Sequence, residues 1–353
     1  MDIKISDYVS QLNNIWEDKC SNFDKLPNIL PKVDRIIVIG DIHGDMKILI
    51  ECLIVGKVIN TKKEWIGGET IVVQVGDQID SCRFDGINSC NDPTKYKSDK
   101  PHDIDILYFM TELHQKAVKK GGAVYSLLGN HEFMNVNSDM SYVSHSNITY
   151  LNNYKTDEDE VISDGMMARK HIFSPGNKIA NFLACSRKTA LIIGSNLFVH
   201  AGIVPYMTNK YNVDEINSLF SLFLLDELDK PKIFHDLFMS SKYSPLWTRI
   251  FGHLNHNNNK CNELLTPLKE IYQVGRIYVG HTPQLKTGIK STCDDRIWLT
   301  DGGMSRSFDP FDYISVKSNG VKKSETRKAQ VLEILNDGDI SDEIPQPITV
   351  LKL

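Results

Sequence analysis

The sequence has no long hydrophobic run and no closely spaced cysteine pair of the CxxC type. Its longest apolar stretch, 219–225, is far too short to cross a bilayer, so no transmembrane helix is expected. The N-terminus lacks a basic segment followed by an apolar one, and we expect no secretory signal. The seven cysteines are scattered and odd in number. We therefore expect reduced thiols in a cytoplasmic or nuclear compartment, with Cys82 and Cys90, the only near neighbours, unbonded.

The sequence also lacks an excess of positive charge. Forty lysines and arginines against 45 aspartates and glutamates give a net charge of -5, which offers no general attraction to nucleic acid or anionic lipid. Neither stable nucleic-acid binding nor membrane association is expected. With 41% hydrophobic and 24% charged residues, the 353-residue chain has the composition of a globular protein with a substantial core. Any phosphate-bearing ligand would have to be held by a local cationic site.

Five short apolar segments, rich in β-branched residues, are predicted to be strands. Each is followed by side chains that can bind a metal. In chain order they are 36–39 with Asp41 and His43, 71–75 with Asp77, 124–128 with Asn130, 197–199 with His200, and 277–279 with His281. Loops that leave the C-terminal ends of strands converge in layered α/β folds, so we expect these side chains to form one site.

The chemistry of these side chains favours a transition metal. Asp41 and His43 are two residues apart, which in extended backbone places both side chains on one face, where they can grip one cation. Asp77 can bridge two cations. Carboxylate, imidazole and amide ligands suit Mn, Fe or Zn. Taken singly, each residue is equally compatible with a turn, a cap or a satisfied core position, and only the ordered conjunction of five strand ends favours a metal centre.

These motifs resemble those of calcineurin-like metallophosphoesterases of the PPP-type phosphatase superfamily, in particular its bacterial-type, diadenosine-tetraphosphatase-like branch. The motifs stand in the family order over about residues 35–305: GDIHGD (40–45), GDQID (76–80), GNHE (129–132), VHAG (199–202) and GHT (280–282). The segment TDGGMS (300–305) resembles a late Asp-x-Gly-Met-Ser segment of that branch. The resemblance implies an α/β fold, a four-layer α/β/β/α sandwich with helical cover over the C-terminal edge of the strands.

The resemblance also implies roles for individual residues. The implied ligands of two divalent metal ions are Asp41, His43 and Asp77 for the first, and Asp77, Asn130, His200 and His281 for the second. Such ions, about 3.5–4 Å apart, activate a hydroxide for in-line attack and neutralise phosphoryl oxygens. His131 is the implied general acid, which protonates the departing alkoxide, and Asp80 orients it.

Arginines are expected to bind the remaining phosphate oxygens through bidentate hydrogen bonds. The family commonly has Arg-Gly after the position of Asp80, whereas this chain has Ser81-Cys82-Arg83, so Arg83 is expected to reach the phosphate from a reshaped loop. Arg187 and Arg249 resemble arginines of the bacterial-type branch, the latter within a Trp-x-Arg element. The alternative for each arginine is a surface ion pair.

Apolar side chains at helical spacing predict an amphipathic helix over residues 5–16, packed on the main body. Although 353 residues would allow two domains, the motifs run through one sheet system. We therefore expect an N-terminal helix within 1–30 and a single catalytic domain over 31–353. Helical spacing over about 140–190 and 203–250 predicts two insertions that cover the sheet edge.

The expected function is a metal-dependent phosphatase that acts on phosphorylated serine or threonine, or on tyrosine, in proteins. The alternative is hydrolysis of a phosphoanhydride in a dinucleoside polyphosphate or an RNA cap, because the metals contact only the phosphoryl group and the covering loops choose what is attached. A non-catalytic phosphate-binding scaffold is disfavoured because no metal ligand of the motifs is missing. The expected partner is thus a phosphorylated protein or nucleotide substrate, and regulatory subunits leave no trace in the sequence.

Overall fold

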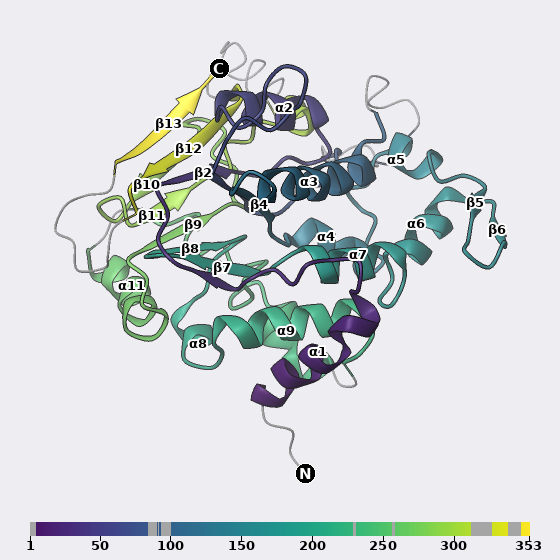
Figure 1. Ribbon diagram of the computed structural model, residues 1–353, viewed down its shortest axis with the longest axis horizontal. Helices are drawn as coiled ribbons and strands as arrows, with labels where there is room; N and C mark the ends of the chain where they lie inside the picture. The colour runs from purple at the N-terminus through teal and green to yellow at the C-terminus, as the bar shows by residue number, and fades with distance from the viewer. Residues whose placement is uncertain are drawn as a thin grey trace.

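Two β-sheets lie face to face at the centre of the computed structural model (Figure 1). The structure describes residues 5–83, 90, 92, 100–228, 231–255, 258–311, 327–337 and 347–353. The first sheet has the strand order β13-β12-β2-β3-β4, and the second has the order β1-β7-β8-β9-β11-β10. The predicted strands are confirmed, but they divide between the sheets: three precede motifs in the first sheet, and two in the second. The motifs therefore run through two facing sheets, which are the two β layers of the expected sandwich.

The first sheet is parallel on one side and antiparallel on the other. Its strands are β2 (Arg35–Ile39), β3 (Ile71–Gln74), β4 (Ala123–Ser126), β12 (Gln330–Leu335) and β13 (Ile348–Lys352). β3 pairs in parallel with both β2 and β4, while β12 pairs in antiparallel fashion with β2 and β13. The parallel strands place the residues after β2, β3 and β4 at the same edge.

The second sheet is also mixed. Its strands are β1 (Ile29–Leu30), β7 (Ala190–Ile193), β8 (Asn196–Val199), β9 (Arg276–Val279), β10 (Lys290–Thr292) and β11 (Ile297–Leu299). β9 pairs in parallel with β8 and β11, so the residues after these three strands again share one edge. A backbone hydrogen bond of 2.8 Å from Leu128 to the carbonyl of Lys188 joins the two sheets near that edge.

Alternating side chains explain why both sheets are covered on two faces. Ile36 and Val38 of β2 belong to the apolar cluster between the sheets, whereas Ile37 and Ile39 pack against the outer helices. All four side chains are fully buried. Burial of such a side chain stabilises the fold by about 1.5–3 kcal/mol, so the near-continuous β-branched run specifies a strand buried on both faces.

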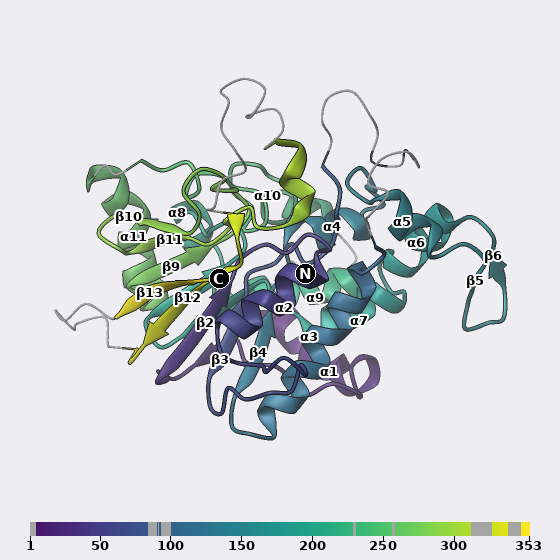
Figure 2. The ribbon, with the colours of Figure 1, turned by 90° about the horizontal axis from the view of Figure 1, so that it is seen from above.

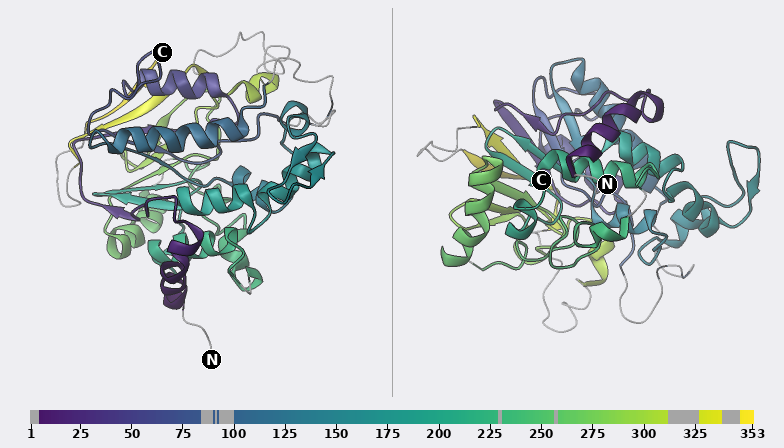
Figure 3. Two further views of the ribbon diagram at one scale, coloured as in Figure 1. Left: turned by 45° about the vertical axis from the view of Figure 1, so that its right-hand side comes forward. Right: turned by 90° about the horizontal axis from the view of Figure 1, so that it is seen from below.

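Helices complete the outer layers. Over the first sheet lie α2 (Met46–Val55) and α3 (Asp103–Val118). Below the second sheet lie α8 (Pro205–Thr208), α9 (Val213–Leu224) and α11 (Asn258–Tyr272). The predicted N-terminal helix is confirmed as α1 (Ile5–Lys19), which packs on α9 through Tyr8, Leu12 and Trp16 (Figure 3). The result is the expected four-layer α/β/β/α sandwich (Figure 1).

The segment 140–190, predicted as a helical insertion, lies beside and beyond one end of the sheets. It contains α5 (His145–Thr149), α6 (Gly165–Phe173) and α7 (Lys178–Ser186), and also a hairpin of β5 (Tyr154–Lys155) and β6 (Val161–Ile162). Figure 2 shows this hairpin reaching away from the sheets. The segment 203–250 contains α8, α9, the 3-10 turn Pro231–Phe234 and α10 (His235–Phe238).

The expectation of reduced cysteines is wrong. Three disulfides join Cys20 to Cys185, Cys82 to Cys90, and Cys261 to Cys293, and only Cys52 is a buried free thiol. The first pair is 165 residues apart in sequence but has Cα atoms 5.4 Å apart, a proximity that the spacing in sequence does not reveal. The cysteines therefore do not support a reducing compartment. No helix in the described ranges is long and apolar enough to span a membrane.

Candidate metal centre

The six predicted metal ligands converge where the loops of the two sheets meet. None of the six is more than 5% exposed. The first sheet supplies the residues that follow β2, β3 and β4, and Asn130 begins the short helix α4 (Asn130–Val136). The second sheet supplies His200 after β8 and His281 after β9. The site is therefore built at the seam between the sheets rather than at the edge of one.

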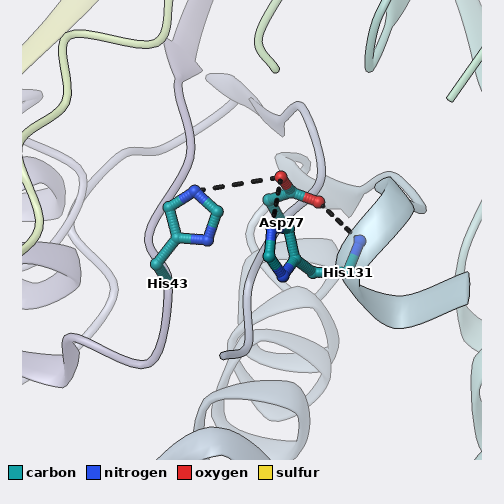
Figure 4. A group of neighbouring side chains, drawn as sticks. All are labelled: His43, Asp77 and His131. Carbon is teal, nitrogen blue, oxygen red and sulfur yellow. Dashed lines mark hydrogen bonds and ion pairs between the residues drawn. The ribbon is translucent and has the colours of Figure 1, made fainter. Parts of the chain in front are cut away.

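Asp77 lies at the centre of the cluster. Its Oδ2 atom is 3.8 Å from Nε2 of His43 and 3.8 Å from Nε2 of His131 (Figure 4). The same oxygen lies 3.3 Å from Nε2 of His200. Two groups of potential ligand atoms share this carboxylate, one with His43 and His131 and the other with His200 and His281. One carboxylate between two ligand groups is the arrangement that a bridging ligand requires.

Each histidine of the cluster has one ring nitrogen directed at a fixed acceptor. His200 Nδ1 is 2.9 Å from the carbonyl of Val75, His281 Nε2 is 3.1 Å from the carbonyl of Trp247, and His43 Nδ1 is 3.4 Å from the carbonyl of Ile79. A carbonyl only accepts, so these nitrogens carry the proton. The opposite nitrogen of each ring then presents a lone pair, as a metal ligand must.

Asn130 joins the two imidazoles of the second sheet. Its Oδ1 atom lies 2.8 Å from His281 Nδ1 and 3.0 Å from His200 Nε2. These are the two nitrogens that do not face a carbonyl. The amide oxygen and two imidazole nitrogens therefore converge on one small space, and Asp77 adjoins it.

The backbone at this site is strained in places. His43, Asp77, Asp80 and His281 all have positive φ, at 47°, 53°, 70° and 66°. Such conformations cost about 1–3 kcal/mol each and persist only where surrounding contacts hold them. The expectation that Asp41 and His43 lie on extended backbone is therefore wrong at His43. The reason is that the amides of Ile42 and His43 both donate to the carbonyl of Asp77, at 3.0 and 2.9 Å.

Two motif glycines allow the loops to approach this closely. A Cβ atom at Gly129 would lie 2.2 Å from the backbone nitrogen of Asp77. A Cβ atom at Gly280 would lie 2.2 Å from Oδ1 of Asp41. Any larger residue at either position would push a ligand-bearing loop away from its neighbour.

Two buried carboxylate oxygens in this region have no hydrogen-bond partner among the described residues. They are Oδ1 of Asp41 and Oδ2 of Asp301. The other oxygen of Asp41 accepts from the His281 amide at 3.0 Å, and that of Asp301 from the Gly303 amide at 2.8 Å. Buried polar atoms are normally satisfied, and an unpaired carboxylate oxygen is a ligand for a divalent cation. The residues present therefore fit a metal centre.

The electrostatics of the cluster agree with this fit. Burial, with the nearby Asp301 and Asp77 carboxylates, raises the pKa of Asp41 well above its usual range. Burial likewise raises the pKa of Asp301 to about 6. Burial would also raise the pKa of Asp77, but the imidazoles of His200, His131 and His43 outweigh it and hold this pKa well below its usual range. The cluster thus holds more negative charge than its own imidazoles neutralise.

Burial keeps two of the imidazoles neutral. It lowers the pKa of His43 well below the ordinary value, with Arg83 adding to the effect. It lowers the pKa of His281 similarly, with contributions from His200 and Arg249. For His200, burial is outweighed by Asp77, and the pKa is raised. Neutral imidazole is the form that binds a metal.

His131 and Asp80 form a buried pair beside the metal ligands. His131 Nδ1 lies 2.8 Å from Oδ2 of Asp80, and the carboxylate is fully buried. The His131 backbone amide donates to Oδ1 of Asp77 at 2.9 Å (Figure 4). The ring is therefore held through Nδ1, and the backbone of the same residue is held through its amide. Nε2 is the ring nitrogen that faces the cluster.

A cavity of about 510 Å³ opens above the cluster. His43, Asp77, Asn130, His131 and His281 reach its wall. Arg83 and Arg249 also line it, together with Asp301 and the aromatic side chains of Tyr142, Trp247 and Phe308. The guanidinium of Arg83 lies 4.8 Å from the ring centre of Phe308 and 5.4 Å from that of Tyr142, and Arg249 donates to the carbonyl of His281 at 2.9 Å.

Arg187 is not brought to this cavity. Its guanidinium is buried and donates to Gln78 Oε1 at 3.1 Å, Thr111 Oγ1 at 2.8 Å and the carbonyl of Leu107 at 2.7 Å. These contacts hold α3 against the loop after β3. Arg187 therefore serves the scaffold in this structure, and it departs from the expected phosphate-binding set.

Two further site residues were not singled out from the sequence. The Glu132 carboxylate accepts from the amides of Asp77, Gln78, Ile79 and Gly129, at 2.7–3.2 Å, and so ties two ligand loops together. Asp301 lines the cavity, as described above. Signals for both were available, since Glu132 completes the GNHE motif and Asp301 stands in the 300–305 segment.

Buried Asp, His and Asn side chains converge at the seam of two facing sheets, and two arginines line the cavity above them. This arrangement is typical of metal-dependent phosphoester hydrolases. The sequence matches the calcineurin-like phosphoesterase family over residues 34–285, and the chain belongs to this family. The family implies divalent metal ions, which the His and Asp groups described above can hold.

Comparisons with individual proteins agree with this assignment. An uncharacterized protein of Acanthamoeba polyphaga mimivirus is 34% identical over 256 residues, which cover 65% of this chain and 96% of that protein. Shewanella-like protein phosphatase 2 of Arabidopsis thaliana is 26% identical over 329 residues, 82% of this chain and 76% of the relative. The fold is similar to that of a cold-active protein-tyrosine phosphatase of a psychrophilic Shewanella species, with a TM-score of 0.60, 20% identity and coverage of 93% and 83%.

Proposed function

We propose that this chain is a metal-dependent protein phosphatase that hydrolyses phosphoserine or phosphothreonine, with phosphotyrosine as a further candidate. The observation that carries the proposal is the set of histidines that each present one nitrogen to the Asp77 cluster while the other faces a fixed acceptor. The cavity above this cluster holds two arginines, as a phosphoryl group requires. The name of the Arabidopsis relative supports the protein substrate.

The proposed ligands follow the two groups that share Asp77, with Asp41 in place of His131, which is kept for proton delivery. They are Asp41, His43 and Asp77 for one ion, and Asp77, Asn130, His200 and His281 for the other. This donor set favours Mn, Fe or Zn. When bound, the two ions would acidify a water molecule and neutralise charge on the phosphoryl group.

His131 is the proposed general acid. Because its Nδ1 is engaged by Asp80, its Nε2 is the atom that can deliver a proton to the departing oxygen. Asp80 holds the ring in this tautomer. Proton delivery matters most when the leaving group is a serine or threonine alkoxide, since such a group departs poorly as an anion.

Arg83 and Arg249 are proposed to bind the phosphate oxygens. Both line the cavity, and each is held by the surrounding protein, Arg83 through the carbonyls of Asp80 and Cys82 and Arg249 through that of His281. The chain has a net charge of -5, so these side chains and the metal ions must supply the local positive charge. Residues 31–353 are proposed to form one catalytic domain, to which the Cys20–Cys185 disulfide fastens α1.

A substrate panel tests the proposal. Phosphoserine, phosphothreonine and phosphotyrosine peptides are assayed beside diadenosine tetraphosphate, with Mn²⁺, Fe²⁺ or Zn²⁺ and with a chelator control. Hydrolysis of the peptides that depends on added metal supports a protein phosphatase. Hydrolysis of the dinucleotide alone would support the phosphoanhydride alternative, and turnover that survives the chelator would contradict the metal mechanism.

A further inference from the structure

Helix α6 of the 140–190 segment places a fully buried arginine beside the His131–Asp80 pair. Arg169 is 0% exposed and lies outside every motif that identified the site. Its Nη2 atom lies 3.5 Å from Oδ1 of Asp80 and 2.8 Å from Oδ2 of Asp103. A buried cation is costly unless it is paired, so this position calls for an explanation.

The contacts of Arg169 form a closed network around Asp80. Arg169 Nε donates to Oδ1 of Asn135 at 2.7 Å, and Asn135 Nδ2 donates to Oδ1 and Oδ2 of Asp80 at 3.0 and 3.1 Å. Asp103 accepts from Arg169 and, through its other oxygen, from the Asp80 backbone amide at 3.2 Å. The Asp80 carboxylate is thus held by two side chains, leaving Oδ2 directed at His131 Nδ1.

The arginine itself is equally fixed. Its guanidinium carbon lies 4.9 Å from the ring centre of Phe173, one turn along the same helix. Three acceptors and one aromatic ring therefore define its position. Arg169 does not line the cavity, so it touches no substrate.

We propose that Arg169 is a positioning residue that acts through Asp80 on His131. Together with Asn135, it fixes the plane of the Asp80 carboxylate, and the carboxylate in turn fixes the imidazole that delivers the proton. The 140–190 segment thereby contributes to the chemical step from outside the metal centre. This inference rests on the proposed function, because it assumes that His131 acts on a leaving group.

The alternative is that Arg169 only neutralises two buried aspartates. The two roles predict different effects on substrates whose leaving groups differ in their need for a proton. Loss of proton delivery slows hydrolysis of a phosphoserine peptide much more than that of 2,4-dinitrophenyl phosphate, whose phenolate departs without protonation. Loss of folding or of metal slows both equally.

The test compares kcat/KM for these two substrates in wild type, Arg169→Lys, Arg169→Met and the double variant Arg169→Met/Asp103→Asn. The double variant removes both members of the buried ion pair and protects against unfolding caused by an unpaired Asp103. Metal content is measured for each sample. We expect the peptide-to-dinitrophenyl ratio to fall at least about 10-fold in both Met variants, with partial recovery in Arg169→Lys.

Two controls separate this proposal from general damage. Arg187→Met removes another buried arginine that has no contact with Asp80, and it should leave the ratio unchanged. In an Asp80→Asn background, Arg169→Met should lower the ratio no further, because Arg169 acts through Asp80. An equal loss for both substrates in the Arg169 variants, or an additive loss in the Asp80→Asn background, would overturn the proposal.

A second readout does not depend on turnover. A hydrogen-bonded His131 Nδ1 proton gives a far-downfield proton NMR signal, which is assigned by its absence in His131→Ala. We expect Arg169→Met/Asp103→Asn to shift or abolish this signal and Arg187→Met to preserve it. An unchanged signal would overturn the positioning role, whereas a wild-type chain with the signal but without hydrolysis of either substrate would overturn the proposed function instead.

Discussion

Asp77 Oδ2 lies 3.3 Å from Nε2 of His200, so a carboxylate at the end of one sheet meets an imidazole at the end of the other. The pair shows that the metal centre depends on how the two sheets pack, and not only on the loops of one sheet. Neighbouring carboxylates at Asp41 and Asp301 add negative charge at the same seam. Divalent cations should therefore hold the sheets together as well as support hydrolysis.

Asp77→Asn should remove most of the bound metal. An amide at this position loses the charge shared by both ligand groups, so metal content should fall sharply and peptide hydrolysis should fall to the limit of detection. Metal analysis of the purified variant measures the first effect directly.

Asp45→Asn is the matched control for Asp77→Asn. Asp45 is also buried, but its oxygens accept from the Ile48 amide and from Arg306, and it caps α2. Asparagine caps a helix about as well as aspartate, so this variant should lose little stability and keep its metal. Equal metal loss in the two variants would show that Asp77 has no special place in the site.

Arg249→Met and Arg187→Met should have opposite signatures. Arg249 lines the cavity, so its loss should raise KM for a phosphopeptide about 10-fold or more and weaken inhibition by inorganic phosphate. Arg187 binds Gln78, Thr111, Ser186 and backbone groups away from the cavity, so its loss should lower the unfolding midpoint while KM changes less than about threefold. Steady-state kinetics and urea unfolding of both variants check this. A large rise in KM for Arg187→Met with no rise for Arg249→Met would instead place Arg187 in the phosphate site.

The number of reactive thiols tests the pairing of the cysteines. When the protein is denatured without reductant and alkylated, one thiol, Cys52, should react, and after reduction all seven should react. Mass spectrometry of the intact chain and of its peptides gives both numbers. Seven reactive thiols before reduction would refute the three disulfides.

The fold and the convergence of the candidate metal ligands were largely predictable because each depends on short-range signals. A strand such as 35–39 consists mainly of consecutive β-branched residues, and the side chains at 41 and 43 follow it directly. His200 and His281 obey the same rule in another sheet. Which sheet each strand joins is decided by pairing between distant segments, and this division was not predicted.

The remaining features depend on contacts that sequence spacing does not encode. Cys20 and Cys185 meet across 165 residues, and Arg169 reaches Asp80 across 89. Arg187 resembled a phosphate ligand by its position in the chain, but the fold directs it at α3. His43 does not have the predicted extended conformation, because its amide donates a hydrogen bond to the loop after the next strand. Each outcome is set by tertiary packing rather than by local pattern.

The Asp301 and Asp41 carboxyls should each make the metal-stripped protein less stable as pH rises from about 4 to 6. Burial raises the pKa of Asp301 to about 6 and that of Asp41 in the same direction, so each of these carboxyls binds more protons in the folded state than in the unfolded state across this window. The lowered pKa values of His43 and His281 act in the opposite sense in the same window, so the contribution of Asp301 is read from a comparison of two chains. The lowered pKa of Asp77 acts in the opposite sense, but only at lower pH. Urea unfolding in chelator at several pH values measures the slope.

Relative to wild type, Asp301→Asn should gain stability as pH rises through this window, since an amide does not titrate. A stability difference between the two chains that does not change with pH would contradict the raised pKa of Asp301. Reloading with Mn²⁺ should restore stability near neutral pH, because the cation replaces the protons that the carboxylates lose.

The most direct test of a metal-dependent phosphatase is a titration of metal back into chelator-stripped protein, with bound metal and phosphoserine-peptide turnover measured on the same samples. The account predicts that the stripped protein neither binds the peptide tightly nor hydrolyses it, and that turnover rises with occupancy up to two ions per chain. Undiminished turnover in protein shown to contain no metal would contradict it.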